Sequence, residues 1–395
     1  MLPIVVLIAA IAVIVLIINI PGCEKEPAAT PTPEPTVEPT AVLEPTPTPF
    51  PTSADEFIAQ MPLEKKLMQM FMITPEALTG VENVTLAGNT TKRALSDNPV
   101  GGLIYFSRNI ESRQQLASML STTQKLYREE NGLPIFLGAD EEGGEVARVA
   151  NSSISVTKLP PMSEIGSAED YDKAYEVGNT IGGYLSVLGF NINFAPVADI
   201  YSEGSAIGVR AFSSNAETVS TMAVSVADGL EDNGVTPVYK HFPGMGSATA
   251  DTHDGMATIS CSLSNMKSNE LLPFTCAISD GAEIIMVSHV SAPNITGSNT
   301  PCSLSKAVVT DLLRTQLGFG GIVITDALDM KAITNSYTPA EAAVNAVAAG
   351  CDILLMPEDY YAALEALIAA VESGKISEER INESVKRILD LKLSM

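Results

Sequence analysis

Basic residues are scarce in this 395-residue chain, which has 23 lysines and arginines against 47 aspartates and glutamates. The formal charge of -24 argues against nucleic acid as a partner and against docking on an anionic membrane surface. Cysteine is also scarce: the five present have no zinc-site spacing and are too few for a disulfide scaffold. With 46% hydrophobic residues, the chain can still bury a substantial core.

The sequence predicts little about the burial and disulfide pairing of the individual cysteines. Cys351 follows Gly350 and opens an apolar run, so we expect it to be a small buried residue. A disulfide among Cys261, Cys276 and Cys302 is neither required nor ruled out by their positions.

The N-terminal residues 1–23 are predicted to anchor the protein to a membrane. Residues 2–22 are uncharged and almost wholly aliphatic, and about 20 such residues span a bilayer. No basic residue precedes the run, unlike a usual signal peptide. Ile20-Pro21-Gly22-Cys23 resembles a bacterial lipoprotein cleavage site, although its proline departs from the pattern. A lipoprotein anchor and an uncleaved transmembrane helix both stay open, and either predicts an extracytoplasmic position in a bacterial cell envelope.

A spacer is predicted next, at residues 24–54. Repeated Thr-Pro and Glu-Pro pairs block helix and sheet, and too few large apolar residues are present to form a core. Such a segment suits an extended linker that lifts a domain away from a surface. Residues 55–395 are predicted as the globular, catalytic domain.

Short apolar runs alternate with amphipathic stretches throughout this domain. Runs that are nearly continuous in apolar residues are typical of parallel strands covered on both faces. The alternation predicts an α/β fold, a (β/α)8 TIM-like barrel, with a doubly wound open sheet as the alternative. The eight predicted strands are Met70 to Ile73, Gly101 to Phe106, Ile135 to Ala139, Ile192 to Ala195, Val235 to Tyr239, Glu283 to Ser288, Gly321 to Thr325 and Asp352 to Met356.

Helices are predicted between these strands. In one of them, the apolar residues between Val219 and Leu230 follow helical spacing, and Ser214 with Glu217 has the sequence of a capping box. Glycines stand where helices should end, because a left-handed residue commonly terminates a helix. These glycines are Gly132, Gly189, Gly234, Gly281 and Gly350.

Unusual polar residues follow the predicted strands, where the catalytic groups of a parallel barrel lie. All three histidines of the chain are near this face, which favours a functional site over three separate structural roles. The strand-end residues are Asp140, Asp199, Lys240, His241, His289 and Asp326.

The loop after the fifth predicted strand contains Asp251-Thr252-His253. If the loop bends, the carboxylate can fix the imidazole tautomer and raise its basicity. A histidine of near-neutral pKa can then donate a proton to a leaving oxygen and later accept one from water. A turn with a solvated histidine would have the same sequence.

Two further acidic features have alternative interpretations. Asp326, directly after a buried strand, could be a nucleophile for an anomeric carbon, or the N-cap of a helix that begins at Ala327. The acidic turn at residues 140–145 could bind a metal ion or sugar hydroxyls, or could be a solvated glycine turn.

Taken together, these motifs resemble the β-N-acetylglucosaminidases of glycoside hydrolase family 3, in the order found in that family. The resemblance covers essentially all of residues 55–395. The matching segments are GGLIYFSRN (101–109), DEEGG (140–144), NFAPVAD (193–199), IGVRAF (207–212), KHFPG (240–244), DTH (251–253), MVSHV (286–290) and ITDAL (324–328).

The resemblance implies a role for each matching residue. Asp326 corresponds to the nucleophile, His253 to the general acid/base and Asp251 to its partner. Residues that correspond to positions holding the N-acetylglucosamine ring are Asp140, Arg148, Arg210, Lys240 and His241. Met245 and Glu145 depart from the family, which commonly has histidine and arginine there, and both bear on substrate preference more than on the reaction.

The implied activity is retaining exo-hydrolysis of non-reducing terminal β-N-acetylglucosamine. The predicted anchor favours cell-wall fragments (muropeptides) as substrates, with chitin oligosaccharides as another option. No metal, organic cofactor or obligate protein partner is implied. Three alternatives remain: a phosphorylase, a metal-dependent hydrolase using His241, Asp251, His253 and His289, and a non-catalytic wall-binding barrel.

Overall fold

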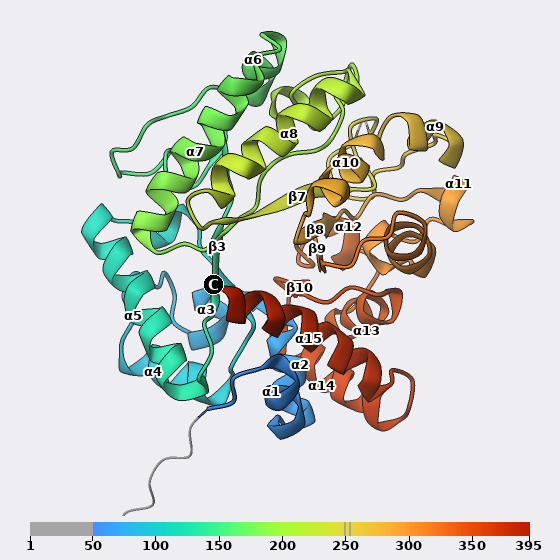
Figure 1. Cartoon of the computed structure of the whole chain (residues 1–395). Helices are drawn as coiled ribbons and strands as arrows, with labels where there is room; N and C mark the ends of the chain where they lie inside the picture. Colours follow the sequence, from blue (N-terminus) through green and yellow to red (C-terminus); the bar gives the residue numbers. More distant parts are fainter. Residues whose placement is uncertain (1–49, 249, 253) are drawn as a thin grey trace, which may run out of the picture. The chain divides into compact units, whose positions relative to one another are not determined.

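The computed structural model describes residues 50–248, 250–252 and 254–395; the predicted anchor, most of the predicted spacer and His253 lie outside the described residues. Its centre is an eight-stranded sheet in the order β10-β1-β2-β3-β6-β7-β8-β9, in which all adjacent strands are parallel. Helices surround the strands (Figure 1). The predicted α/β fold is therefore confirmed, and the sheet is nearly closed like a barrel rather than open.

All eight predicted strands are present, although most are shorter than the apolar runs that predict them. A separate two-stranded antiparallel hairpin follows β3 and is formed by β4 and β5. The strands are β1 (Phe71–Ile73), β2 (Gly102–Ile104), β3 (Phe136–Ala139), β4 (Glu141–Gly143), β5 (Val146–Ala147), β6 (Ile192–Asn193), β7 (Thr236–Phe242), β8 (Ile284–Val287), β9 (Ile322–Thr325) and β10 (Leu354–Leu355).

The sheet closes between β9 and β10, where a parallel bridge joins Ile324 to Ile353. Because β10 is only two residues long, side chains supply part of the hydrogen bonding at this seam. The Thr325 hydroxyl accepts from the Leu355 N–H at 3.1 Å, and the Asp352 carboxylate accepts from the Val323 N–H at 2.9 Å. The seam thus joins β9 to β10, which pairs on its other side with β1.

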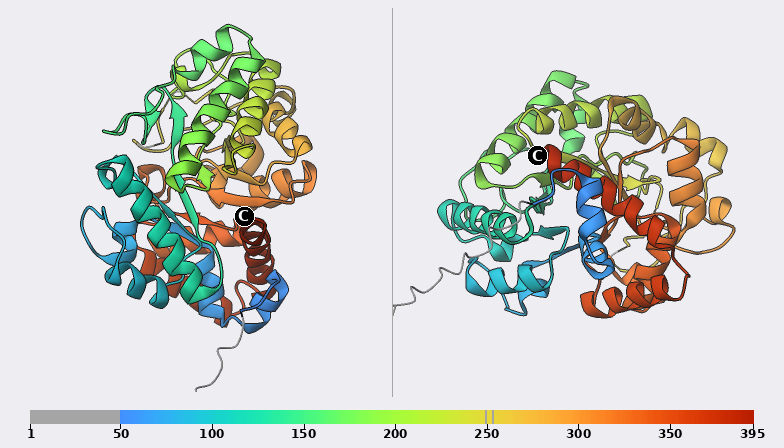
Figure 2. Two further views of the ribbon diagram at one scale, coloured as in Figure 1. Left: turned by 60° about the vertical axis from the view of Figure 1, so that its left-hand side comes forward. Right: turned by 60° about the horizontal axis from the view of Figure 1, so that its bottom comes forward.

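Helices cover the outside of the sheet on all sides, as the two further views show (Figure 2). The N-terminal helices α1 and α2 pack against the C-terminal helix α15, so both ends of the domain lie side by side. No helix of the described residues is long and apolar enough to cross a membrane.

The longer helices are α4 (Asn89–Asp97), α5 (Arg113–Asn131), α7 (Tyr171–Leu188), α8 (Ala216–Glu231), α10 (Leu272–Asp280), α13 (Pro339–Ala349), α14 (Tyr360–Glu372) and α15 (Glu378–Ser394). The remaining helical segments are α1 (Ala54–Gln60), α2 (Leu63–Gln69), α3 (Pro75–Thr79), α6 (Met162–Ser167), α9 (Leu263–Ser268), α11 (Pro293–Thr296), α12 (Lys331–Thr334), η1 (Ser107–Asn109), η2 (Gly208–Arg210), η3 (Cys302–Leu304) and the ten-residue π-helical η4 (Ala307–Gln316).

Helix ends follow the predicted pattern with one correction. All five predicted glycines have positive φ, and four of them directly cap α5, α7, α10 and α13. The predicted capping box at α8 is wrong, because the N-cap is Asn215 rather than Ser214. The Asn215 side chain accepts hydrogen bonds from the N–H groups of Glu217 and Thr218. An asparagine side chain can accept hydrogen bonds from these free N–H groups as well as a serine side chain can. Helix α8 therefore begins one residue later than predicted.

The cysteines outside the N-terminal region carry no disulfide. Cys261, Cys276, Cys302 and Cys351 are all free, so the open pairing among the first three is not formed. Cys351 is fully buried, as predicted.

Glycines let α7 and α8 approach closely on the outside of the barrel. A Cβ atom on Gly178 would lie 2.0 Å from the backbone oxygen of Val226, and one on Gly229 would lie 2.4 Å from that of Tyr175. Real Cβ atoms do not reach such distances, so neither position accepts a side chain without moving a helix.

Gly178→Ala should therefore destabilise the domain by about 1–3 kcal/mol, through overpacking between the two helices. Gly183→Ala, in the same helix, is the control, because its Cβ would meet only the Asn233 side chain at 3.6 Å. The control should be neutral or gain up to about 1 kcal/mol in helix propensity. Thermal denaturation of both variants measures the difference; equal midpoints would contradict close packing at Gly178.

Carboxylates gather around the C-terminal end of α8, near the end of the barrel where the strands begin. Burial, followed by the charges of Glu283 and Asp228, raises the pKa of Glu231 to about 7. Burial also raises the pKa of Asp228 and of Glu283. Folding therefore becomes less favourable as these groups lose their protons.

The sign of the pH effect follows from this raised pKa. The folded state binds a proton at Glu231 more tightly than the unfolded chain, so stability should fall as pH rises from about 4.5 to about 7. We expect Glu231→Gln to lose less stability than the wild type between pH 5 and pH 8 in denaturant titrations. Glu365→Gln, at an exposed position of α14, is the control. Parallel curves for Glu231→Gln and wild type would refute the assignment.

Candidate active site

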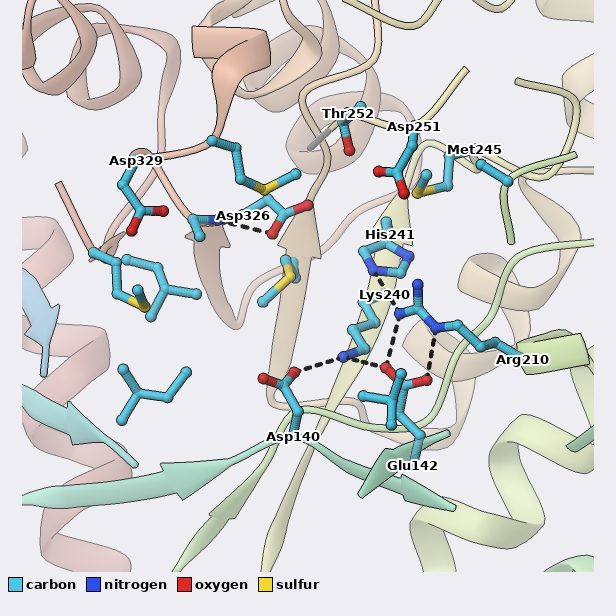
Figure 3. A pocket seen from close by; sticks show the side chains of 18 of the residues that line it. Asp140, Glu142, Arg210, Lys240, His241, Met245, Asp251, Thr252, Asp326 and Asp329 are labelled. Atoms are coloured by element: carbon cyan, nitrogen blue, oxygen red, sulfur yellow. Dashed lines mark hydrogen bonds and ion pairs between the residues drawn. The ribbon is translucent and has the colours of Figure 1, made fainter. Parts of the chain in front are cut away.

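A cavity of about 310 Å³ opens at the carboxyl ends of the barrel strands (Figure 3). Its lining is charged on one side and apolar on the other. Seven of the eight sequence-predicted site residues line it: Asp140, Arg148, Arg210, Lys240, His241, Asp251 and Asp326. The eighth, His253, lies outside the described residues. Segments almost 200 residues apart in sequence thus meet in one place, because parallel strands of a barrel end on the same face.

Strand β7 supplies two adjacent polar residues to this cavity. Successive residues of a regular strand point to opposite faces, so Lys240 and His241 would normally diverge. The pairing of β7 with β8 changes register between Tyr239 and Phe242. Such an irregularity re-aims side chains, and both residues line the cavity here.

Lys240 is the centre of a buried charge cluster. Its ammonium lies 2.9 Å from an oxygen of Asp140 and 2.7 Å from one of Glu142. Arg210 binds Glu142 through two parallel hydrogen bonds, both 2.8 Å long. Arg148 completes the cluster, with its guanidinium 3.7 Å from Asp140. The side chains of Lys240 and Glu142 are 3% and 2% exposed, so water barely screens their attraction.

The cluster fixes the protonation of its members. Burial alone would raise the pKa of Glu142, but the positive charges of Lys240 and Arg210 outweigh it and lower that pKa to about 2. For Lys240, burial acts against the charge, and Asp140 and Glu142 still raise the pKa above its ordinary value. Glu142 and Lys240 therefore stay charged at neutral pH, and they offer a ligand a fixed acceptor and a fixed donor.

His241 is oriented by Asp199, which follows β6. Nδ1 of His241 lies 2.6 Å from one Asp199 oxygen, and the other oxygen accepts from the Met245 N–H at 2.7 Å. Nε2 lies 3.5 Å from Arg210, which can only donate. This arrangement assigns the proton to Nδ1 and leaves Nε2 as the acceptor. Because Met245 is held through its backbone, the residue type at this position does not alter the anchor.

Asp326 directly follows β9 and is half-buried in the cavity wall. No helix begins at Ala327; α12 begins at Lys331, so Asp326 is not a helix N-cap. One of its carboxylate oxygens accepts a hydrogen bond from the Ala327 N–H at 2.8 Å, while its backbone N–H donates to Val287. The side chain is thereby held at the strand end, facing the charged cluster (Figure 3).

The surroundings of Asp326 favour its ionised form. Burial would raise the pKa of this carboxyl, but nearby His289 and His241 oppose it. The hydrogen bond from Ala327 and the charge of Lys240 act in the same direction, and the pKa lies below its ordinary value. A carboxylate that is ionised, partly desolvated and fixed in direction can act as a nucleophile.

His289 supports this wall rather than lining the cavity. Its Nε2 lies 2.9 Å from the backbone oxygen of Ala327, and its Nδ1 lies 2.7 Å from the Ser303 hydroxyl. Since a carbonyl oxygen can only accept, Nε2 carries the proton. Burial lowers the pKa of His289. Its role is to hold the backbone next to Asp326.

The acidic turn at residues 140–145 is a hairpin whose carboxylates are already engaged by the protein. Glu141 is fully buried and accepts from the N–H groups of Val149 and Ala150 and from the Tyr184 hydroxyl. Asp140 and Glu142 bind the cationic side chains described above. Among the described residues, no group of three or more His, Cys, Asp and Glu side chains is arranged to hold a metal ion.

The other side of the cavity is apolar. Met286, Met330 and Met356 contribute to its lining, as do Ile104 and Leu355, whereas Met245 lies beside Asp251 (Figure 3). Methionine side chains are flexible and polarisable, so they adapt to the outline of a bound ring. A sugar ring has both polar hydroxyls and apolar C–H faces, and a cavity with one charged and one apolar side suits it.

Sequence reasoning missed three residues of the site. Glu142 was treated only as part of an acidic turn, although its spacing of two from Asp140 places both on one side of an extended segment. Asp329 and Thr252 also line the cavity, at its mouth and in its wall. No periodic pattern marks either of them, because each lies in an irregular loop.

Comparison with known proteins agrees with this geometry. Residues 62–391 match the glycosyl hydrolase family 3 N terminal domain. The chain is 31% identical over 376 residues to beta-hexosaminidase LpqI of Mycobacterium tuberculosis, covering 92% of each chain. It is 30% identical over 388 residues to beta-hexosaminidase A of Pseudoalteromonas piscicida, but spans 64% of that protein.

A solved structure is also similar. The glycoside hydrolase family 3 beta-N-acetylglucosaminidase from Paenibacillus sp. str. FPU-7 superimposes with a TM-score of 0.79 at 38% identity, over 84% of this chain and 62% of that one. The match of residues 62–391, the parallel barrel and the order of the site residues lead to one conclusion: this chain belongs to glycoside hydrolase family 3.

Proposed function

We propose that this protein is a retaining β-N-acetylglucosaminidase that removes a non-reducing terminal N-acetylglucosamine from its substrate. The observation that carries the proposal is the position of Asp326. This ionised carboxylate stands at the end of β9 in the same cavity as the Lys240, Glu142 and Arg210 cluster. The N-acetyl preference is supported by the similar proteins, which are named as a beta-hexosaminidase and a beta-N-acetylglucosaminidase.

The first chemical step joins Asp326 to the sugar. Its carboxylate attacks the anomeric carbon, the bond to the leaving oxygen breaks, and the leaving oxygen takes a proton from His253. Lys240 and Arg210 hold the ring hydroxyls in a fixed orientation, which keeps the anomeric carbon in line with the nucleophile.

The second step releases the sugar. His253, now neutral, takes a proton from a water molecule, and this water attacks the same carbon and restores Asp326. Asp251, two residues before the predicted acid/base in the sequence, lines the cavity and would orient the imidazole. Two inversions at one carbon give overall retention.

The size of the cavity supports exo-hydrolysis. A volume of about 310 Å³ lies at the small end of the range for ligand pockets, about 300–1,000 Å³. Such a cavity holds one sugar ring with its end enclosed, rather than an extended chain.

The natural substrate follows from the proposed location. An uncharged run at residues 2–22 and a proline-rich spacer support a membrane-anchored enzyme outside the cytoplasm of a bacterium. There it would meet muropeptides and other cell-wall fragments, with chitin oligosaccharides as further candidates. No nucleic acid, cofactor or protein partner is needed for this activity.

Hydrolysis of a chromogenic β-N-acetylglucosaminide tests the proposal. We expect the wild type to release the β-anomer, as followed by NMR, at a rate that does not depend on phosphate. Asp326→Ala should lose about 10³-fold or more in kcat/KM, and His253→Ala about 10²–10⁴-fold.

Each alternative gives a different result in this assay. A sugar 1-phosphate product with phosphate-dependent turnover would identify a phosphorylase. Loss of activity on chelation, with recovery on adding zinc, would identify a metal-dependent hydrolase. Binding without turnover would identify a wall-binding module, and full activity in Asp326→Ala would remove that residue from the mechanism.

The buried cluster generates a second prediction. Glu142→Gln leaves Lys240 and Arg210 with one carboxylate fewer in a nearly dry site, which should destabilise the fold by about 3–5 kcal/mol and raise KM. Exposed Glu145→Gln, in the same hairpin, is the control and should change stability by less than about 0.5 kcal/mol. An unchanged denaturation midpoint and KM in Glu142→Gln would contradict the proposed ring-holding cluster.

A further inference from the structure

The backbone just before position 253 is held by the segment that follows Asp326. Thr252 is 2% exposed, and its carbonyl oxygen accepts a hydrogen bond of 3.2 Å from the N–H of Ala332. Ala332 belongs to α12, the short helix that follows β9. Residues at the ends of two different strands, β7 and β9, are therefore joined by a backbone contact at the cavity.

The donor side of this contact is rigid. Between Asp326 and α12, the Ala327 carbonyl is bound by His289 and the Leu328 N–H donates to Leu355 at 2.9 Å. Ala332 and Ile333 are each 1% exposed. The position of the Ala332 N–H is thus fixed with respect to the proposed nucleophile.

On the acceptor side, the contact lies within a turn. The Asp254 N–H donates to the Asp251 carbonyl at 3.0 Å. An exposed ion pair also joins Lys331 to Asp254, 3.9 Å apart. Such an exposed ion pair contributes little to stability, so the buried backbone hydrogen bond between Ala332 and Thr252 is the stronger link between the two segments.

We infer that the Ala332 N–H is a positioning group for catalysis, because its bond to Thr252 fixes the backbone next to Asp251, the proposed partner of the acid/base, relative to the nucleophile. The inference rests on the proposed function. It deepens that function by naming the contact through which the loop after β7 and the strand end of β9 act as one unit. A displacement of about 1 Å in a catalytic group can lower the rate about 10²-fold. Loss of the single hydrogen bond between Ala332 and Thr252 can therefore lower the rate measurably.

Replacement of Ala332 by proline tests the inference, because proline lacks the N–H. Proline is tolerated in the first turn of a helix, where N–H groups have no partner within the helix. Lys331→Pro is the matched control: it places the same residue one position earlier, in the same helix, and keeps the Ala332 N–H. If Ala332→Pro fails to fold, lactic acid incorporated at position 332 removes only the N–H and replaces it with an ester oxygen.

The decisive readout compares two substrates with the same sugar. A dinitrophenyl leaving group needs no proton, whereas the sugar leaving group of N,N'-diacetylchitobiose does. We expect Ala332→Pro to lower kcat/KM about tenfold for the disaccharide and to leave the dinitrophenyl substrate within about twofold of wild type. Lys331→Pro should match the wild type with both. A merely structural defect would lower both substrates equally and would overturn the inference, as would no loss at all.

His253→Ala in the same assay distinguishes the proposed acid/base role of His253 from the positioning role of the Ala332 N–H. If it also loses activity selectively on the disaccharide while Ala332→Pro behaves as wild type, the acid/base stands and the positioning role of Ala332 fails. If wild type is inactive, or His253→Ala shows no selectivity, the proposed mechanism fails and the inference fails with it.

Discussion

The seam between β9 and β10 is held by a buried carboxylate, Asp352, whose oxygens are shared among the groups that close the barrel. It accepts from the Val323 N–H and the Ser384 hydroxyl and pairs with Arg314, Arg380 and Arg387. Arg380, Ser384 and Arg387 come from α15. One side chain therefore ties the last helix to the junction of β9 and β10. Without closure, β9 would be an edge strand, and Asp326 would face solvent instead of a cavity.

Closure also explains the charge arrangement of the site. Lys240, Glu142 and Arg210 come from β7, β4 and η2, and each would be costly to bury by itself. The converging strand ends place them within hydrogen-bonding distance of one another, so each charge is compensated. The compensated cluster then presents fixed polar groups to the cavity. The apolar methionines opposite it complete a cavity with two chemically different sides.

Part of the candidate site lies on loops, beyond the ends of the strands. The predicted nucleophile stands directly on a strand end, whereas Asp251 and Thr252 lie nine and ten residues beyond β7. A loop of this length needs contacts of its own to be positioned. Asp199 binds its beginning through the Met245 N–H, and α12 binds it at Thr252. The geometry between the two proposed catalytic groups therefore depends on neighbouring loops as much as on the barrel.

The amino-acid sequence by itself determined the eight strands, the glycine helix ends and the strand-end positions of Asp140, Lys240, His241 and Asp326. Apolar periodicity and turn residues act locally, and parallel strands leave little freedom in where their ends point. It did not determine the start of α8, where Ser214 and Asn215 are both good caps. Only the tertiary structure decided that Glu142 lies between Lys240 and Arg210, that Asp199 orients His241, and that Thr252 binds α12. These contacts join residues far apart in the chain, and their partners are selected by distance in space, which no local pattern encodes.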